Sequence, residues 1–319
     1  MLYFPIVIEQ ICLFVIYALL GVYAVKKGYF TSASLDVISK LLIKITIPIM
    51  LFANTINGAT REEFIAALPI LLATVLMYAL LYLLSLILAR VFRLSGNRGH
   101  VYQACTMYGN IGFIGIPIVA ALFPERGMLY IALFTVIDQL TLWTIGISLT
   151  SPMGGSRTLS PAEVAKKMVN PAVIAILLAV VFVFTGWRLP EVLNTGLKNV
   201  GGITSVLAMI YIGGLFCFTD IAGYLRHLEI YAEIIVKMIL FPPVFYMILR
   251  LIPGLTQEIR FTLSVLTALP TMSTIPMFAR DQRSDGEYGA GMLFVTTVCS
   301  VVTLPFVCLI LEQLSRVFT

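Results

Sequence analysis

Two short stretches of the sequence combine polar side chains with glycine and proline inside otherwise apolar segments. The first reads YGNIGFIGIPIV over residues 108–119, and the second reads LPTMSTIPMF over residues 269–278. Proline has no N–H donor and clashes with the preceding helical turn, and glycine lowers the cost of leaving helical geometry. A helix interrupted in this way presents free backbone N–H groups and the positive end of a helix dipole. The pattern therefore favours a site for an anion, most simply a carboxylate.

We expect the first helix to be interrupted between Gly109 and Pro117, and the second between Pro270 and Pro276. Glycines three or four residues apart also let membrane helices pack closely, so each stretch alone has a purely structural interpretation. Two matched interruptions favour ligand binding instead. The predicted substrate contacts are Gly109, Asn110, Gly112, Gly115, Pro117, Pro270, Thr271, Ser273, Thr274, Pro276 and, in a neighbouring apolar segment, Asn54.

Ionisable side chains inside apolar segments indicate a second kind of chemistry. Asp138 is followed by Gln139 in the middle of such a segment, where a charged carboxylate is costly and is a functional candidate by default. We expect Asp138 to take up a proton together with the substrate. A hydrogen-bonded structural aspartate and Na⁺ coordination are the alternatives. Lys237 either pairs with Glu233, four residues before it, or places a cation near the substrate path.

The composition is that of a membrane protein crossed many times by helices. Of the 319 residues, 60% are hydrophobic and only 12% are charged, and the mean hydropathy is +0.99. Soluble domains carry about 25% charged residues. The five cysteines have no metal-binding spacing, and the motifs of ATP hydrolysis and of common hydrolases are absent from the sequence. We therefore expect no enzyme activity, no metal, no cofactor beyond a coupling H⁺ or Na⁺, and no nucleic-acid partner.

Apolar runs of about 20 residues are long enough to cross a membrane as helices. The sequence contains ten such runs, and lysine and arginine are more frequent in the odd-numbered loops between them than elsewhere. This bias predicts that both termini lie outside and that the loop after the fifth run lies inside. The predicted spans are 5–25, 35–57, 64–89, 100–123, 128–149, 170–187, 195–219, 228–252, 260–280 and 288–313.

The two halves of the chain resemble each other. GMLYI at 127–131 recurs as GMLFV at 291–295, and GIPIVA at 115–120 recurs as TIPMFA at 274–279. Because each half holds an odd number of spans, the second copy must enter the membrane inverted. Inverted repeats with paired interrupted helices are typical of secondary transporters. We predict a first repeat over residues 1–150, a short cytoplasmic linker over 151–168 and a second repeat over 169–319.

Three stretches of the sequence resemble the auxin efflux carrier family, which includes PIN-type transporters and bacterial carriers of malate, malonate and similar acids. They are YGNIGFIGIP at 108–117, NPAVIAILL at 170–178 and ALPTMSTIPMFARDQ at 268–282. The resemblance implies ten spans with two crossing broken helices, as in sodium–proton antiporters and bile-acid symporters. It also implies a small organic anion as substrate and a homodimer, with Asn110 as the crossover asparagine. The short linker is similar to that of bacterial members.

We therefore expect a secondary active transporter of a small organic anion, a mono- or dicarboxylate, that works by alternating access. Its expected location is the plasma membrane or the bacterial inner membrane. The alternative is a cation–proton antiporter on the same architecture, with Asp138 as the shared ligand of ion and proton. Such a site prefers paired carboxylates, whereas the sequence places Gln139 beside Asp138.

Overall fold

The structure is a computed structural model that describes residues 3–58, 60–152, 169–218 and 223–317. These residues form helices and connecting turns, and the one β-bridge among them joins Gly109 to Thr271. Six helices are long and apolar enough to cross a membrane, and two shorter apolar helices accompany them. The long ones cover Tyr3–Lys26, Arg61–Val91, Gly127–Leu149, Glu191–Phe216, Leu228–Leu249 and Gly286–Val317; the shorter ones cover Ile111–Leu122 and Pro171–Thr185.

The predicted apolar segments are helical over most of their described residues, with ends shifted by a few positions. In the first half the helices are α1 (Tyr3–Lys26), α2 (Ser32–Leu41), α3 (Ile47–Gly58), α4 (Arg61–Ala67), α5 (Pro69–Val91), α6 (Gly96–Met107), α7 (Ile116–Leu122), α8 (Gly127–Thr141) and α9 (Ile147–Leu149). In the second half they are α11 (Pro171–Thr185), α12 (Glu191–Phe216), α13 (Leu228–Glu233), α14 (Phe241–Leu249), α15 (Gln257–Thr267), α16 (Thr274–Asp281) and α17 (Gly286–Val317).

Several helix junctions are π-helical turns that keep the chain continuous. They lie at Leu42–Thr46 between α2 and α3, Ile111–Gly115 before α7, Leu142–Gly146 between α8 and α9, and Ile234–Leu240 between α13 and α14. Such turns bulge the backbone locally and are frequent at functional sites. The proposed linker lies almost wholly outside the described residues.

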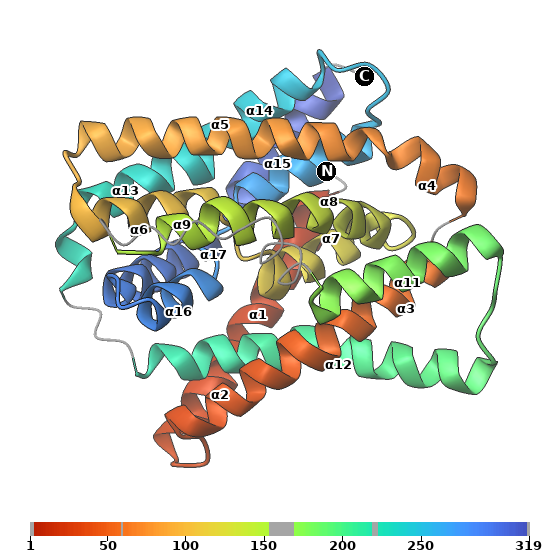
Figure 1. The fold of residues 1–319 in the computed structure, drawn as a ribbon, viewed down its shortest axis with the longest axis horizontal. Helices are drawn as coiled ribbons and strands as arrows, with labels where there is room; N and C mark the ends of the chain where they lie inside the picture. Colours follow the sequence, from red (N-terminus) through yellow and green to blue (C-terminus); the bar gives the residue numbers. More distant parts are fainter. Residues whose placement is uncertain (1–2, 59, 153–168, 219–222, 318–319) are drawn as a thin grey trace.

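The helices form two groups whose contacts define where a site can lie. In the first group α12 packs against α1, α2 and α3, and α11 packs against α3. In the second group α5 packs against α6 and α8, α14 against α15, and α16 against α17. Figure 1 shows α12 along one edge of the molecule and α5 along the opposite edge. The interrupted helices α6–α7 and α15–α16 belong to the second group. Contacts between the groups include those of α7, α8, α17 and the turn Ile111–Gly115 with the first.

The crossing of α1 and α12 has backbones in direct contact. A Cβ atom at Gly213 would lie 2.0 Å from the carbonyl oxygen of Ala18, and a Cβ atom at Gly21 would lie 2.0 Å from that of Ile210. Small residues at a crossing let membrane helices approach closely and gain van der Waals contact. This crossing therefore holds α1 and α12 together.

We expect Gly213→Ala to lower the melting temperature of the purified protein in detergent. The added methyl group would overlap a backbone atom that cannot move away alone, which costs about 3 kcal/mol. Gly202→Ala on the same helix is the matched control, because a Cβ atom there meets nothing within 4 Å. Equal melting temperatures for the two variants would contradict the close crossing.

Candidate functional site

The two interrupted helices meet at their interruptions. After α6 ends at Met107 the chain is non-helical until the π-helical turn at Ile111, and after α15 ends at Thr267 it is non-helical until α16. The two extended segments lie antiparallel, with the N–H of Asn110 donating to the carbonyl of Pro270 at 2.8 Å. The N–H of Met272 donates to the carbonyl of Tyr108, also at 2.8 Å. Each interruption therefore satisfies part of the other's backbone, as buried non-helical backbone requires.

Glycine is needed where the two segments cross. A Cβ atom at Gly109 would lie 3.0 Å from the Cβ of Leu269 and 3.2 Å from the carbonyl oxygen of Leu266. At Gly115 it would lie 2.8 Å from the Cδ1 of Leu269. A Cβ atom at Gly112 would meet only the side chain of Ile47, at an ordinary 3.5 Å. Gly109 and Gly115 thus serve close packing, whereas Gly112 faces a cavity.

The interruptions are shorter than the prolines predict. Pro117 is the second residue of α7 and Pro276 is the third residue of α16, so both lie inside helices rather than at the end of a gap. Proline costs little at Pro276, because the first turn of a helix has no intrahelical acceptors for its N–H groups. Pro117 instead follows the π-helical turn Ile111–Gly115, which is continuous with α7. Because Pro117 has no N–H to donate to the preceding turn, its position also accounts for the π-helical turn before α7.

A cavity of about 290 Å³ lies beside the crossing. Asn110 is 2% exposed, and its side-chain nitrogen is buried without a hydrogen-bond partner in the described structure. The cavity wall is otherwise mostly apolar and aromatic, and it holds no lysine or arginine among the described lining residues. Its polar lining side chains are Asn110, Thr135, Asp138, Gln139, Asn170, Ser273 and Thr274, and its aromatic ones are Phe113, Trp143 and Phe278.

Asp138 is buried and is held by a chain of side-chain hydrogen bonds. The hydroxyl of Tyr78 donates to its Oδ1, and the side-chain amide of Gln139 donates to its Oδ2 at 3.0 Å. The amide of Asn170 donates in turn to Gln139 at 3.0 Å. The Asn170 Oδ1 accepts from the backbone N–H groups of Ala172 and Val173, which caps α11. Hydrogen bonds thus connect Asp138 on α8 to α5 and, through Gln139, to the beginning of α11.

The sequence did not single out Tyr78 and Asn170 as site residues. They lie 60 and 31 positions away from their partners along the chain. Asn170 does show a local signal, because an asparagine directly before a proline and an apolar run is typical of a helix N-cap.

Lys237 contacts the second interruption but does not line the cavity. Its ammonium group donates to the carbonyl of Leu269, one residue before Pro270. It also lies 3.8 Å from Oε1 of Glu233, and both side chains are buried. The Glu233 oxygens have no hydrogen-bond partner among the described residues, so Lys237 compensates their buried charge. Lys237 therefore lies beside Glu233 and contacts the second interruption, and a role on the substrate path stays a prediction.

We expect Lys237→Met to destabilise the protein by about 3–5 kcal/mol, because it leaves a buried carboxylate uncompensated. The double variant Lys237→Met/Glu233→Leu should recover most of that loss, since no charge remains. Thermal unfolding in detergent measures both effects. A single variant as stable as the parent would show that the pair and the Leu269 contact do not hold the crossing.

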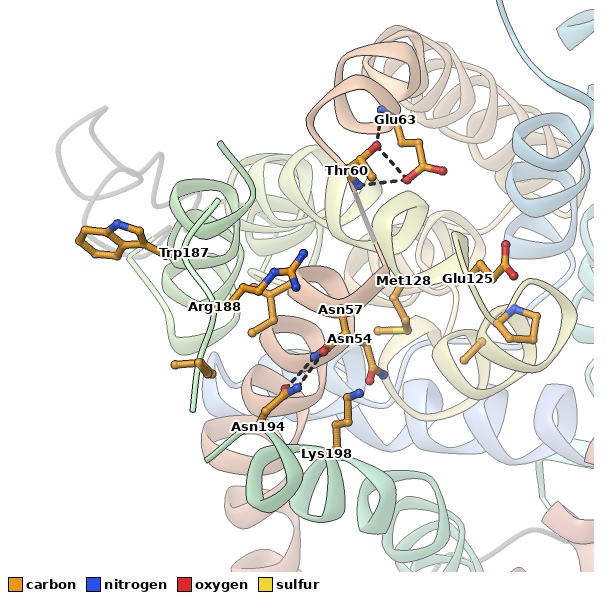
Figure 2. A pocket seen from close by; sticks show the side chains of 14 residues that line it. Asn54, Asn57, Thr60, Glu63, Glu125, Met128, Trp187, Arg188, Asn194 and Lys198 are labelled. Atoms are coloured by element: carbon orange, nitrogen blue, oxygen red, sulfur yellow. Dashed lines mark hydrogen bonds between the residues drawn. The ribbon is translucent and has the colours of Figure 1, made fainter. Parts of the chain in front are cut away.

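The remaining predicted contacts do not line this cavity. The Thr271 side chain is fully buried and donates to the carbonyl of Cys105 at 3.4 Å. Pro270 does not line the cavity, and Asn54 lines a separate, larger one (Figure 2). Among the described residues, no group of histidine, cysteine and carboxylate side chains is arranged to hold a metal ion.

The helices and the buried crossing define a multi-pass membrane protein. The family model described as membrane transport protein matches residues 6–167 and 156–308. The chain belongs to this family, that of the auxin efflux carriers, and the resemblance seen in the sequence is thereby confirmed.

Two curated relatives are each described as an uncharacterized transporter. The chain is 26% identical over 200 residues to an uncharacterized transporter of Methanothermobacter thermautotrophicus, covering 61% of this chain and 63% of the relative. It is 24% identical over 159 residues to an uncharacterized transporter of Schizosaccharomyces pombe, covering 44% of this chain and 35% of the relative. The matches thus span less than two thirds of either relative.

Proposed function

We propose that this protein is a secondary active transporter of a small organic anion and works by alternating access around the crossing. The observation that carries the proposal is Asn110, which lines the cavity where two half-helices begin and whose side-chain nitrogen is buried without a partner in the described structure. Helix N-termini and amide donors together are suited to a carboxylate. Ser273 and Thr274 add hydroxyl groups from the second half-helix.

The cavity lining favours a monocarboxylate with an apolar body over a dicarboxylate. One carboxylate can be bound by the Asn110 amide and by backbone N–H groups of the half-helices. A second carboxylate would have to lie against Phe113, Trp143, Phe278 and aliphatic side chains, without a lysine or arginine among the described lining residues. Burying an uncompensated charge against such a wall is costly.

Asp138 is the proposed proton carrier. It is the one carboxylate among the described residues that line the cavity. An entering anion would repel its negative charge, so uptake of a proton and binding of the anion favour each other. The alternative of a cation–proton antiporter prefers a second carboxylate, and the groups bonded to Asp138 are the Gln139 amide and the Tyr78 hydroxyl instead.

We further propose ten spans in two inverted repeats, residues 1–150 and 169–319. The packing supports this arrangement, because contacts recur with the halves exchanged. Helix α1 packs on α12 as α11 packs on α3, and α5 packs on α6 as α14 packs on α15. The proposal includes a homodimer in the plasma membrane or bacterial inner membrane, with both termini outside.

Uptake into proteoliposomes tests the function directly. A panel of aromatic and aliphatic monocarboxylates and of dicarboxylates is supplied under an imposed pH gradient, and then under an imposed Na⁺ gradient. We expect accumulation of a monocarboxylate when the outside is acidic. Proton movement driven by Na⁺, without uptake of any acid, would instead establish the antiporter.

A further inference from the structure

A second cavity, of about 1010 Å³, lies where the ends of α3, α7 and α11 approach the beginnings of α4 and α12 (Figure 2). More than half of its lining residues are polar or charged, a larger share than at the crossing. The polar and charged residues that line it are Asn54, Asn57, Thr60, Glu63, Glu125, Arg188, Asn194 and Lys198. Asn57 and Asn194 join α3 to α12 across one side of it by reciprocal amide hydrogen bonds of 2.8 and 2.9 Å.

Positive charge predominates in this cavity. Figure 2 shows Arg188 and Lys198 directed toward the same space as Asn54, and neither forms an ion pair with a described carboxylate. Glu63 is already paired, because its Oε1 accepts from Arg126 at 2.9 Å, and this hydrogen bond together with the Glu63 charge raises the pKa of that arginine. Of the lining charges, this leaves two cations against the single carboxylate of Glu125.

The two cavities follow each other along the same helices. On α3, Leu51 lines the cavity at the crossing, and Asn54, three residues later, lines the polar one. On α7, Ile116 lines the first and Ala120, four residues later, lines the second. Three to four residues make one helical turn, a rise of about 5.4 Å. A layer about one turn thick, which includes the buried Leu51 and Ile116, therefore separates them.

We propose that this polar cavity is the outer vestibule of the transport route, and that Arg188 and Lys198 form a capture site for the substrate carboxylate. The inference rests on the proposed function. Its lining residues Thr60, Glu125 and Arg188 belong to the loops that the lysine and arginine distribution predicts to lie outside. Asn54 is then the polar contact between the capture site and the crossing, which gives this predicted binding residue a place on the route.

Thiol labelling tests the vestibule without relying on transport. Asn54→Cys, in a background with the five native cysteines replaced by alanine, is reacted with an anionic and a cationic methanethiosulfonate. We expect the ratio of the anionic to the cationic rate to fall about 3- to 10-fold when Arg188→Gln and Lys198→Gln are added, and to fall likewise in high salt. A ratio that the two substitutions leave unchanged would overturn the capture site.

Transport kinetics tests the role in substrate delivery. Arg188→Gln/Lys198→Gln is expected to lower kcat/KM about fivefold at low ionic strength, to leave kcat unchanged, and to converge with the parent in high salt. Lys40→Gln/Lys44→Gln is the control for the same change of charge away from this cavity. An effect that salt does not alter would contradict delivery and assign the two cations a structural role. An effect that vanishes in liposomes without anionic lipid would also contradict delivery and assign them to lipid headgroups. If the parent transports no acid, the proposed function fails, and the labelling result still decides whether the cavity attracts anions.

Discussion

Asn110→Ala is expected to weaken binding of the transported acid about 10- to 100-fold while the protein stays folded. A hydrogen bond to a charged group contributes about 1.5–3 kcal/mol, and Asn110 supplies the one unpartnered amide nitrogen at the crossing cavity among the described residues. Because that nitrogen donates to no other group of the described structure, its removal leaves no protein acceptor unsatisfied. The melting temperature in detergent should therefore change little.

Isothermal titration calorimetry of the purified variants measures this effect. Asn110→Asp should bind more weakly still, since it places a carboxylate against a carboxylate. Asn199→Ala is the matched control, because Asn199 is exposed on α12 and lines neither cavity. Parental affinity in Asn110→Ala would show that the substrate binds elsewhere.

Asp138→Asn is expected to abolish accumulation driven by a pH gradient. If one proton enters with each anion, a gradient of one pH unit supports about a tenfold accumulation, equivalent to about 1.36 kcal/mol. Asparagine cannot take up the proton, so the variant should only equilibrate the acid. The sign follows from the direction of proton entry: in the parent, acidifying the outside raises uptake, and in the variant it does not.

Exchange of labelled for unlabelled acid separates coupling from folding. Asp138→Asn should retain exchange, because asparagine can still accept a hydrogen bond from Tyr78. Asp36→Asn, on the exposed face of α2, changes the same charge outside the site and should behave as the parent. A parental pH response in Asp138→Asn would remove this carboxylate from the coupling step.

The interruptions were predictable because their cause is local. Gly109 and Pro270 mark them in the sequence, and the structure places a break at each. Their extent was not predictable to the residue. Pro117 and Pro276 indicated longer gaps. A π-helical turn precedes Pro117 and the first turn of α16 holds Pro276, so each helix resumes earlier.

The hydrogen-bonded side chains around Asp138 could not be predicted from the sequence, because tertiary packing brings them together. Tyr78 on α5 carries no local pattern that distinguishes it from other membrane tyrosines, and only the contact of α5 with α8 brings it to the carboxylate. For Asn54, too, the sequence could predict only part of the environment. Its position inside an apolar segment predicts a buried polar group. The cavity that it lines depends on α12 and on the loop before α12, which are distant in the sequence.

Alkylation of single cysteines at the crossing tests most directly whether the transported acid binds there. Gly112→Cys and Ser273→Cys place a thiol on each half-helix at the cavity, and Gly202→Cys on α12 lies outside it. We expect the acid to slow alkylation at the first two positions severalfold, with a half-maximal concentration equal to its binding constant, and to leave Gly202→Cys unaffected. If a saturating concentration of a transported acid left both crossing positions as reactive as before, the crossing would not be the binding site.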